Sequence, residues 1–279
     1  MSVLEAILLG AIQGITEFLP VSSSGHLVLF QKILGISEPA LFFDTIVHVG
    51  TLTPVFVVLW KDILDILRKP VQPLTGYLIL ATLPAVLVAL AGKDLIESAF
   101  ASGSFLGFAF LITAALLVGS ELLSRRAATA ALKGKDDINW VDALVIGVLQ
   151  GVAIIPGVSR SGATLSGALS RRLNRDFAAR FSFLLSIPAI LGALVLQVKD
   201  LLDPAEVEGI VANAGASGSA GIGALPIIAG TLVAAVVGFF SVRLMLKIVR
   251  ERSLLGFAVY TGVLGLLVLV DRFGTHLFF

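Results

Sequence analysis

Hydrophobic residues gather along the chain in six long stretches that carry few charges. Each stretch is long enough to cross the bilayer core as one helix, which takes about 20 residues. The sequence predicts transmembrane helices near residues 39–60, 72–92, 102–122, 176–198, 224–246 and 254–271. The expected fold class is therefore an all-α integral membrane protein with six full spans.

Two further apolar segments, 1–35 and 138–170, are interrupted by proline, serine and glycine. The first contains GAIQGITEFLPVSSSGHLVLF, and the second contains GVLQGVAIIPGVSRSGATLSGAL. Each half of these segments is too short to cross the membrane alone. A broken backbone at membrane depth is tolerated only where protein or a wet cavity satisfies its polar groups. The pattern therefore predicts two re-entrant helical hairpins whose loops dip towards the midplane.

The two broken segments resemble each other. An alignment without gaps of residues 10–25 with 147–162 gives seven identities in sixteen positions. The identical pairs are Gly10/Gly147, Gln13/Gln150, Gly14/Gly151, Val21/Val158, Ser22/Ser159, Ser24/Ser161 and Gly25/Gly162. Three predicted spans follow each hairpin, which indicates one membrane domain built from two repeats, 1–137 and 138–279. Because three is odd, this is an inverted-topology repeat, in which the binding site lies near the midplane where the broken helices meet.

Composition narrows the class of protein. Of 279 residues, 57% are hydrophobic and 14% are charged, against roughly 45–50% and 25% in an average soluble domain. With a mean hydropathy of +1.01, the composition excludes a soluble enzyme. A net charge of +1 gives no case for nucleic-acid binding. The absence of cysteine excludes a disulfide, a thiol nucleophile and a cysteine-bound metal.

Lysine and arginine are distributed unevenly between the two sets of predicted loops. One side carries Lys61, Arg68, Lys69, Arg125, Arg126, Lys133, Lys135, Arg171, Arg172, Arg175, Lys247, Arg250 and Arg252. The other side carries Lys32, Lys93, Lys199 and Arg272. The positive-inside rule places the first set in the cytoplasm, which predicts that both termini are extracytoplasmic. The first hairpin then opens outward and the second inward, and the segment 209–223, rich in Ala, Gly and Ser, is expected to be a flexible outer loop.

Polar side chains interrupt both hairpins, and ionisable groups within membrane segments are usually functional. Gln13 and Glu17 share one helical face and precede the loop at 20–26, whereas the second loop, at 156–164, carries Arg160. Hydroxyl-rich turns that open helices can cradle an anion, and a guanidinium matches phosphate oxygens. A carboxylate can hold magnesium, which bridges phosphates. This combination is typical of phosphoryl transfer.

The same residues also admit structural interpretations. Glu17 alone could cap the backbone break, residues 22–24 could be a helix N-cap cluster, and His26 could be structural. As a set, these residues could form the polar hinge of a transporter. Asp44 and His48, four apart within the first span, predict either a pair that faces the same cavity or a hydrogen bond between helices.

Residues near the predicted membrane interfaces are expected to have simpler roles. Glu5, Glu121 and Asp142 are expected to face water or lipid headgroups. Trp60 and Trp140 are expected to anchor the chain at the interface.

At its two hairpin loops the sequence resembles the undecaprenyl-pyrophosphate phosphatase family, also called the BacA or bacitracin-resistance family. That family carries an (E/Q)xxxE stretch leading into a PVSSxGH loop, and later a PGxSRSxxT loop. Here these motifs stand at 13–17, 20–26 and 156–164. Length, span number and duplicated hairpins also agree, so the resemblance covers essentially the whole chain. Gln13 takes the variable first position of the acidic motif and leaves one fewer carboxylate for a metal.

The resemblance implies hydrolysis of undecaprenyl pyrophosphate to the monophosphate and inorganic phosphate, which recycles the lipid carrier for cell-wall synthesis and confers bacitracin resistance. By position, the implied catalytic residues are Glu17, Ser23, His26 and Arg160. The implied substrate-binding residues are Ser22, Ser24, Gly25, Ser159, Ser161, Gly162 and Thr164. The implied cofactor is a divalent metal at Gln13 and Glu17, magnesium with calcium as the alternative. A secondary transporter or lipid translocator of the same architecture is the alternative function.

Ser23 and His26 lie three apart at the turn that opens the second half-helix. A serine hydroxyl is a poor nucleophile unless a neighbour takes its proton, and His26 is the only imidazole in either hairpin. We therefore predict attack by Ser23 with His26 as base, with direct attack by His26 or by a metal-activated water as alternatives. Ser22 and Ser24 have serine counterparts in the second hairpin, which predicts a shared capping role. Because the first hairpin opens outward, hydrolysis is expected at the extracytoplasmic face.

Overall fold

The computed structural model of the chain describes residues 1–36, 41–92, 96, 98, 105–126, 131–202 and 222–278. This part of the chain is helical and contains no β-strand, apart from one isolated bridge between Lys133 and Leu173. The helices are α1 (Val3–Thr16), α2 (Ser23–Ile33), α3 (Leu41–Gly50), α4 (Leu52–Val58), α5 (Trp60–Arg68), α6 (Pro73–Ala91), α8 (Leu106–Arg126), α9 (Trp140–Val152), α10 (Arg160–Ser170), α11 (Arg175–Leu202), α13 (Ala224–Glu251), α14 (Leu255–Val270) and the π-helical turn η1 (Asp271–Thr275). The predicted all-α class is confirmed.

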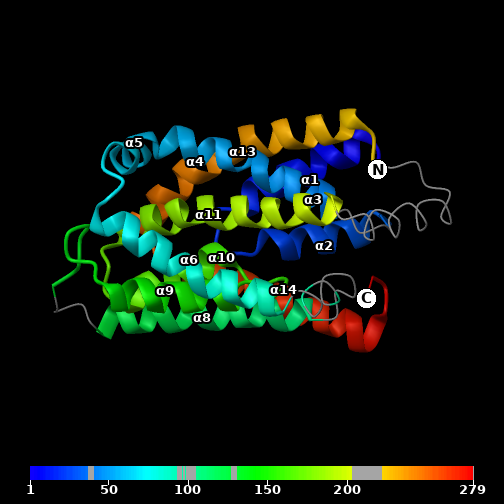
Figure 1. The fold of residues 1–279 in the computed structure, drawn as a ribbon. Coiled ribbons are helices and arrows are strands. Elements are labelled where there is room, and N and C mark those ends of the chain that lie inside the picture. Colours follow the sequence, from blue (N-terminus) through cyan, green and yellow to red (C-terminus); the bar gives the residue numbers. More distant parts are fainter. Residues whose placement is uncertain are drawn as a thin grey trace.

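Long apolar helices dominate the bundle (Figure 1). Five described helices are long and apolar enough to cross a membrane, namely α6, α8, α11, α13 and α14. The pair formed by residues 42–58 and α5 is a sixth candidate when counted as one bent span. Five of the six predicted spans therefore coincide with one continuous helix each. These helices are those of a multi-pass membrane protein.

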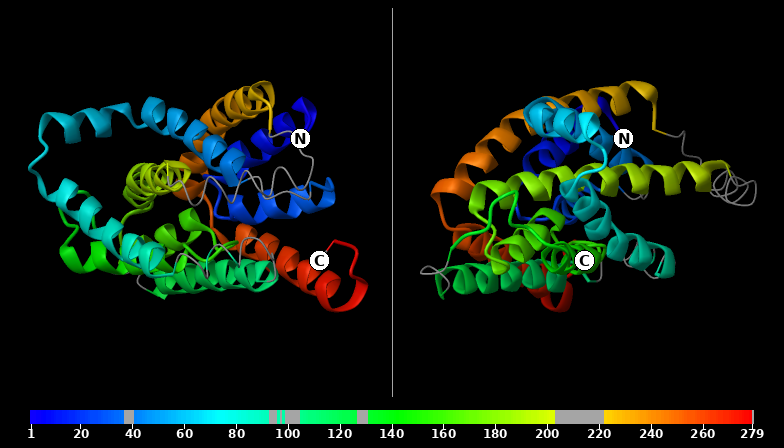
Figure 2. Two further views of the ribbon diagram at one scale, coloured as in Figure 1. Left: turned by 45° about the vertical axis from the view of Figure 1, so that its right-hand side comes forward. Right: turned by 60° about the vertical axis from the view of Figure 1, so that its left-hand side comes forward.

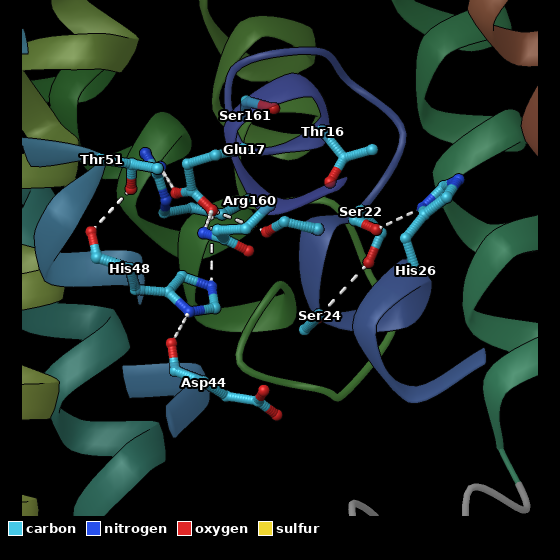
Figure 3. Close-up of polar contacts among 12 residues, drawn as sticks. Thr16, Glu17, Ser22, Ser24, His26, Asp44, His48, Thr51, Arg160 and Ser161 are labelled. Atoms are coloured by element: carbon cyan, nitrogen blue, oxygen red, sulfur yellow. Dashed lines mark hydrogen bonds and ion pairs between the residues drawn. The ribbon is translucent and has the colours of Figure 1, made fainter. Parts of the chain in front are cut away.

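The span predicted over 39–60 differs from the others because it is divided. Helix α3 ends at Gly50, α4 begins at Leu52, and α5 leaves the axis of the preceding helix at 82°. Pro54 explains the first break, because proline has no N–H to donate to the carbonyl of Gly50 one turn earlier. Thr51, at this break, and His48, near the end of α3, lie close to Glu17 (Figure 3).

The two interrupted segments form two pairs of short helices. Helices α1 and α2 have 14 and 11 residues, and α9 and α10 have 13 and 11. At 1.5 Å per residue the longest measures about 21 Å, less than the roughly 30 Å of a bilayer core. Figure 1 shows that the pairs come from opposite ends of the bundle, with the N- and C-termini together at one end.

Close backbone contacts join each short pair to the other half of the chain. Helix α1 packs against α13, and α9 packs against α6 (Figures 1 and 2). A Cβ atom on Gly10 would lie 2.2 Å from the carbonyl oxygen of Gly230, and one on Gly147 would lie 2.7 Å from that of Ala81. Small residues allow this close approach of helices. Gly10 and Gly147 are an identical pair of the internal alignment, so the matched residues make matched contacts.

Two acidic residues contradict their predicted exposure. Glu121 and Asp142 are buried, with 4% and 0% of their surface exposed. The two carboxylate oxygens of Glu121 lie 2.8 and 2.9 Å from Arg175 Nη2. Asp142 accepts from Lys133 Nζ and Arg171 Nε, each at 2.8 Å. Because a buried carboxylate needs a partner, these ion pairs join loops and helix ends instead of facing water or lipid headgroups.

The other interface residues agree better with expectation. Glu5 is partly exposed and forms a capping box with Ser2 at the start of α1. Trp60 and Trp140 begin α5 and α9 and are 55% and 62% exposed. Of the loop predicted over 209–223, positions 209–221 lie outside the described residues.

Candidate active site

The loops of the two short helix pairs lie against each other. Ser161 Oγ donates to the carbonyl oxygen of Leu19 at 3.0 Å, and Ser24 Oγ accepts from the amide of Gly157 at 3.4 Å. Each contact joins a residue of one loop to the loop of the other pair. The predicted convergence of the two motifs is therefore confirmed by backbone and side-chain contacts.

Matched serines cap the two helices that leave these loops. Ser22 Oγ accepts from the amide of Gly25 at 3.2 Å, and Ser159 Oγ accepts from that of Gly162 at 3.0 Å. The predicted capping role is confirmed for Ser22 and Ser159. It was wrong for Ser24 and Ser161, whose hydroxyls bond to the loop of the other pair. Ser22 also has φ = 73°, in the left-handed region. A non-glycine residue there carries backbone strain, which proteins concentrate at functional sites.

Glu17 is the buried centre of the site, with 5% of its surface exposed. It caps the C-terminus of α1, where the helix breaks. Its Oε1 accepts from Arg160 Nη2 at 2.5 Å, whereas Oε2 accepts from Ser23 Oγ at 2.6 Å and from Gln13 Nε2 at 2.9 Å. His48 Nε2 lies 3.4 Å from the same Oε2 (Figure 3). Helices α1, α2, α3 and α10 thus all contribute to one carboxylate.

Two buried polar atoms of this cluster have no hydrogen-bond partner among the described residues. They are Arg160 Nη1 and Gln13 Oε1. Leaving a buried donor or acceptor unpaired costs about 1–3 kcal/mol, and more for a charged group. The unpaired guanidinium N–H is suited to an anionic oxygen, and the unpaired amide oxygen is suited to a cation or a donor. The cluster therefore has bonding capacity left for a ligand.

His26 does not contact Ser23 in the way that the sequence predicted. Its Nδ1 lies 2.7 Å from the carbonyl oxygen of Ser22, and its Nε2 lies 2.7 Å from Tyr260 Oη. The ring also stacks on Tyr260 and meets the edge of Phe110. Because a carbonyl only accepts, Nδ1 carries the hydrogen, and Nε2 accepts from the phenol. Glu17, and not His26, is therefore the acceptor for the Ser23 hydroxyl.

Asp44 and His48 each take one of the two predicted roles: His48 faces the site, and Asp44 forms a hydrogen bond between helices. His48 faces Glu17, whereas the carboxylate of Asp44 points away from it (Figure 3) and accepts from Gln31 Nε2 on α2 at 2.7 Å. His48 Nδ1 contacts the backbone carbonyl of Asp44, not its side chain. The spacing of the pair identified His48 as a candidate but could not tell which partner faces the site.

Tyr260 and Ser182 are contacts that the sequence analysis missed. Tyr260 is one of only two tyrosines in the chain. Its phenol lies within an apolar predicted span, which could have marked it as a partner for a polar group. Thr164 is fully buried, and its Oγ1 lies 2.6 Å from Ser182 Oγ. Thr164 therefore ties α10 to α11, a role that the loop motif alone did not predict.

The donor set suits a hard cation that keeps much of its own water shell. No group of three or more His, Cys, Asp or Glu side chains that could hold a metal lies within the described residues. Glu17 offers a carboxylate, and Gln13 offers the unpaired amide oxygen. Magnesium binds through one or two carboxylates together with waters and substrate phosphates. The residues fit such an ion better than an all-protein metal cage.

Known proteins resemble the chain over nearly its full length. The family model described as "Bacitracin resistance protein BacA" matches residues 6–267. An undecaprenyl-diphosphatase of Carboxydothermus hydrogenoformans is 46% identical over 270 residues, covering 97% of each chain. One of Methanosphaera stadtmanae is 38% identical and covers 97% of this chain and 98% of its own. "Undecaprenyl-diphosphatase 3" of Bacillus cereus is 40% identical and covers 98% of both. With this match along the whole sequence and both loop motifs joined at Glu17, the chain belongs to the bacitracin resistance protein BacA family.

Proposed function

We infer that the protein is an integral membrane phosphatase that hydrolyses undecaprenyl pyrophosphate to the monophosphate and inorganic phosphate. The relatives that match it over nearly their whole length are named undecaprenyl-diphosphatase. The product of this reaction is the lipid that carries cell-wall precursors. The observation that carries the proposal is the Arg160–Glu17–Ser23 cluster. A partly buried guanidinium, whose buried Nη1 has no partner among the described residues, stands there close to a serine whose hydroxyl is bonded to a carboxylate.

The pyrophosphate binds between the two loops. Arg160 Nη1 donates to a phosphate oxygen, while Nη2 keeps its bond to Glu17. Helices α2 and α10 both begin at these loops, and helix N-termini attract anions through their free N–H groups and their dipoles. The loop residues Ser22, Ser24, Gly25, Ser159, Ser161 and Gly162 form the walls of this anion site. The prenyl tail remains among the membrane lipids.

Ser23 is the nucleophile. Its Oγ attacks the terminal phosphorus while its proton passes to Glu17 Oε2, the atom to which it is already bonded at 2.6 Å. The bond from phosphorus to the bridging oxygen breaks, and the lipid monophosphate leaves. Water then attacks the phosphorus of the phosphoserine and the bond from phosphorus to Ser23 Oγ breaks. Ser23 takes back its proton from Glu17, and inorganic phosphate leaves together with the proton released by the water. His26 supports the loop through Ser22 and Tyr260. The competing mechanisms are attack by His26, which a trapping experiment would reveal as a phosphohistidine, and direct attack by water.

Gln13 and Glu17 would hold a divalent cation, magnesium, that completes the charge balance. Pyrophosphate brings at least two negative charges into a site where Glu17 is paired with Arg160. When bound, such an ion would supply positive charge to neutralise the phosphates. Calcium is the alternative ion. Gln13 would supply its unpaired Oε1, and Glu17 would supply a carboxylate oxygen.

The chain forms an inverted-topology repeat of residues 1–137 and 138–279 with both short helix pairs re-entrant. The matched packing of α1 on α13 and of α9 on α6 supports this arrangement, as does the approach of the two pairs from opposite ends (Figure 1). The termini share one end of the bundle, whereas α11 begins and α13 ends near the other (Figure 1). In the sequence, Arg171 and Arg172 lie just before α11, and Arg252 directly follows α13. By the positive-inside rule the termini and the opening of the first hairpin face the extracytoplasmic side.

Phosphate release from a prenyl pyrophosphate by the purified protein in detergent, with and without a chelator, tests the function. Release that stops with the chelator and returns with magnesium is the expected result. A transporter or lipid translocator would bind the substrate without releasing phosphate. Substrate binding without turnover in active preparations would therefore exclude the phosphatase.

A further inference from the structure

His48 is the contact of Glu17 that the proposed reaction leaves unused. It belongs to α3, and its Nε2 lies 3.4 Å from Glu17 Oε2. That oxygen is the one that also accepts from Ser23. The His48 side chain is 24% exposed, whereas that of Glu17 is 3% exposed. The imidazole therefore lies on the accessible side of a buried carboxylate.

The orientation of the His48 ring is fixed by its own helix. Nδ1 lies 2.6 Å from the carbonyl oxygen of Asp44, and because a carbonyl only accepts, Nδ1 carries a hydrogen. The carbonyl of His48 in turn accepts from Thr51 Oγ1 at 2.6 Å, at the break between α3 and α4. Nε2 is thus directed at Glu17 by a braced segment (Figure 3).

Glu17 needs such support because it stands at the broken end of α1. Arg160 draws Oε1 towards α10, and Gln13 reaches Oε2 from the same helix as Glu17 itself. The contact from α3 comes through His48. Without it, Gln13, which belongs to the same helix end as Glu17, would be the remaining donor that holds Oε2 in place for the Ser23 hydroxyl.

We infer that His48 is a positioning residue for Glu17: with a hydrogen on both ring nitrogens, one directed at the Asp44 carbonyl and one at Glu17, it pairs with Oε2 at 3.4 Å and holds the carboxylate so that Oε2 faces Ser23. This inference rests on the proposed function. A carboxylate oxygen only accepts, so the role requires a donor at that place and does not require an imidazole. His48 lies on α3, outside the two loops that bind pyrophosphate, so its removal should lower kcat and leave KM unchanged.

The test compares two substitutions of similar size. His48→Leu removes the donor, and His48→Gln replaces it with an amide N–H. Initial rates of phosphate release from farnesyl pyrophosphate give kcat and KM for the full-length protein in detergent. A misplacement of about 1 Å in an active site can cost about a hundredfold in rate, so we expect a kcat loss of about tenfold to a hundredfold for His48→Leu. His48→Gln should retain most of the wild-type kcat.

His276→Leu is the matched control, because His276 is exposed and lies beyond α14. It should leave both constants unchanged. If His48→Leu does not fold, His48→Ala takes its place, with the thermal transition of each variant recorded. Wild-type kcat in His48→Leu, a kcat for His48→Gln as low as that for His48→Leu, or a loss confined to KM would each overturn the inference. Absence of phosphate release from the wild-type protein would instead count against the proposed function.

Discussion

Replacing Arg160 removes two interactions from the candidate active site at once. Its Nη2 holds Glu17 Oε1 at 2.5 Å, and its buried Nη1 has no partner among the described residues. Arg160→Ala removes the donor aimed at the phosphate and the counter-charge of Glu17 together. Loss of one transition-state donor costs about 10²–10³ in rate, which is about 2.7–4 kcal/mol. We therefore expect kcat/KM to fall at least about a hundredfold.

Arg160→Lys distinguishes geometry from charge. An ammonium is a point charge and cannot contact Glu17 and a phosphate oxygen with the fixed fork of a guanidinium. We expect it to recover only a minor part of the lost activity. The assay is phosphate release at a range of prenyl pyrophosphate concentrations, with the thermal transition of each variant measured alongside.

Arg243→Ala is the control for removal of an arginine from a membrane helix. Arg243 is exposed on α13 and stacks on Phe239, with its guanidinium carbon 5.4 Å from the ring centroid. We expect it to keep wild-type turnover. Near wild-type turnover in Arg160→Ala would refute the assignment of the anion site to Arg160.

Two further predictions concern packing and topology. Gly10→Ala would place a Cβ atom 2.2 Å from the carbonyl oxygen of Gly230, so it should lower the unfolding free energy by about 1–3 kcal/mol and lower the thermal transition. Gly119→Ala is the control, because its Cβ atom would meet nothing within 4 Å. Equal thermal transitions of the two variants would contradict the close packing of α1 on α13. A cysteine at Gly134, in a chain that otherwise has none, should react with an impermeant thiol reagent only from the cytoplasmic side, and reaction only from outside would reverse the proposed orientation.

The internal alignment was the most informative feature of the sequence. Its identical residues perform backbone tasks in both halves, such as the close contacts of Gly10 and Gly147 and the caps made by Ser22 and Ser159. Such tasks depend on residue type and on local geometry, so a pattern of identities can reveal them. The same comparison marks the asymmetric positions, among them Glu17, where the second half has Ile154.

The sequence pattern could not predict which side chains from distant elements would contact each other. The spacing of Ser23 and His26 predicted a pair, but the serine turns back to Glu17 and the imidazole turns to Tyr260, 234 residues away. Hydropathy placed Asp142 at an interface because it cannot distinguish an exposed acid from a buried one. The partner Arg171 is 29 residues away, and only the fold brings the two charges together.

Analysis of the trapped phosphoenzyme tests the central claim most directly. The purified protein is mixed with prenyl pyrophosphate labelled in its terminal phosphate, quenched within one turnover, digested and examined by mass spectrometry. The account predicts an acid-stable, base-labile phosphate on Ser23 that is absent from Ser23→Ala, whose turnover is also lost. An acid-labile phosphate on His26, or wild-type turnover in Ser23→Ala, would contradict the assignment of Ser23 as the nucleophile held by Glu17.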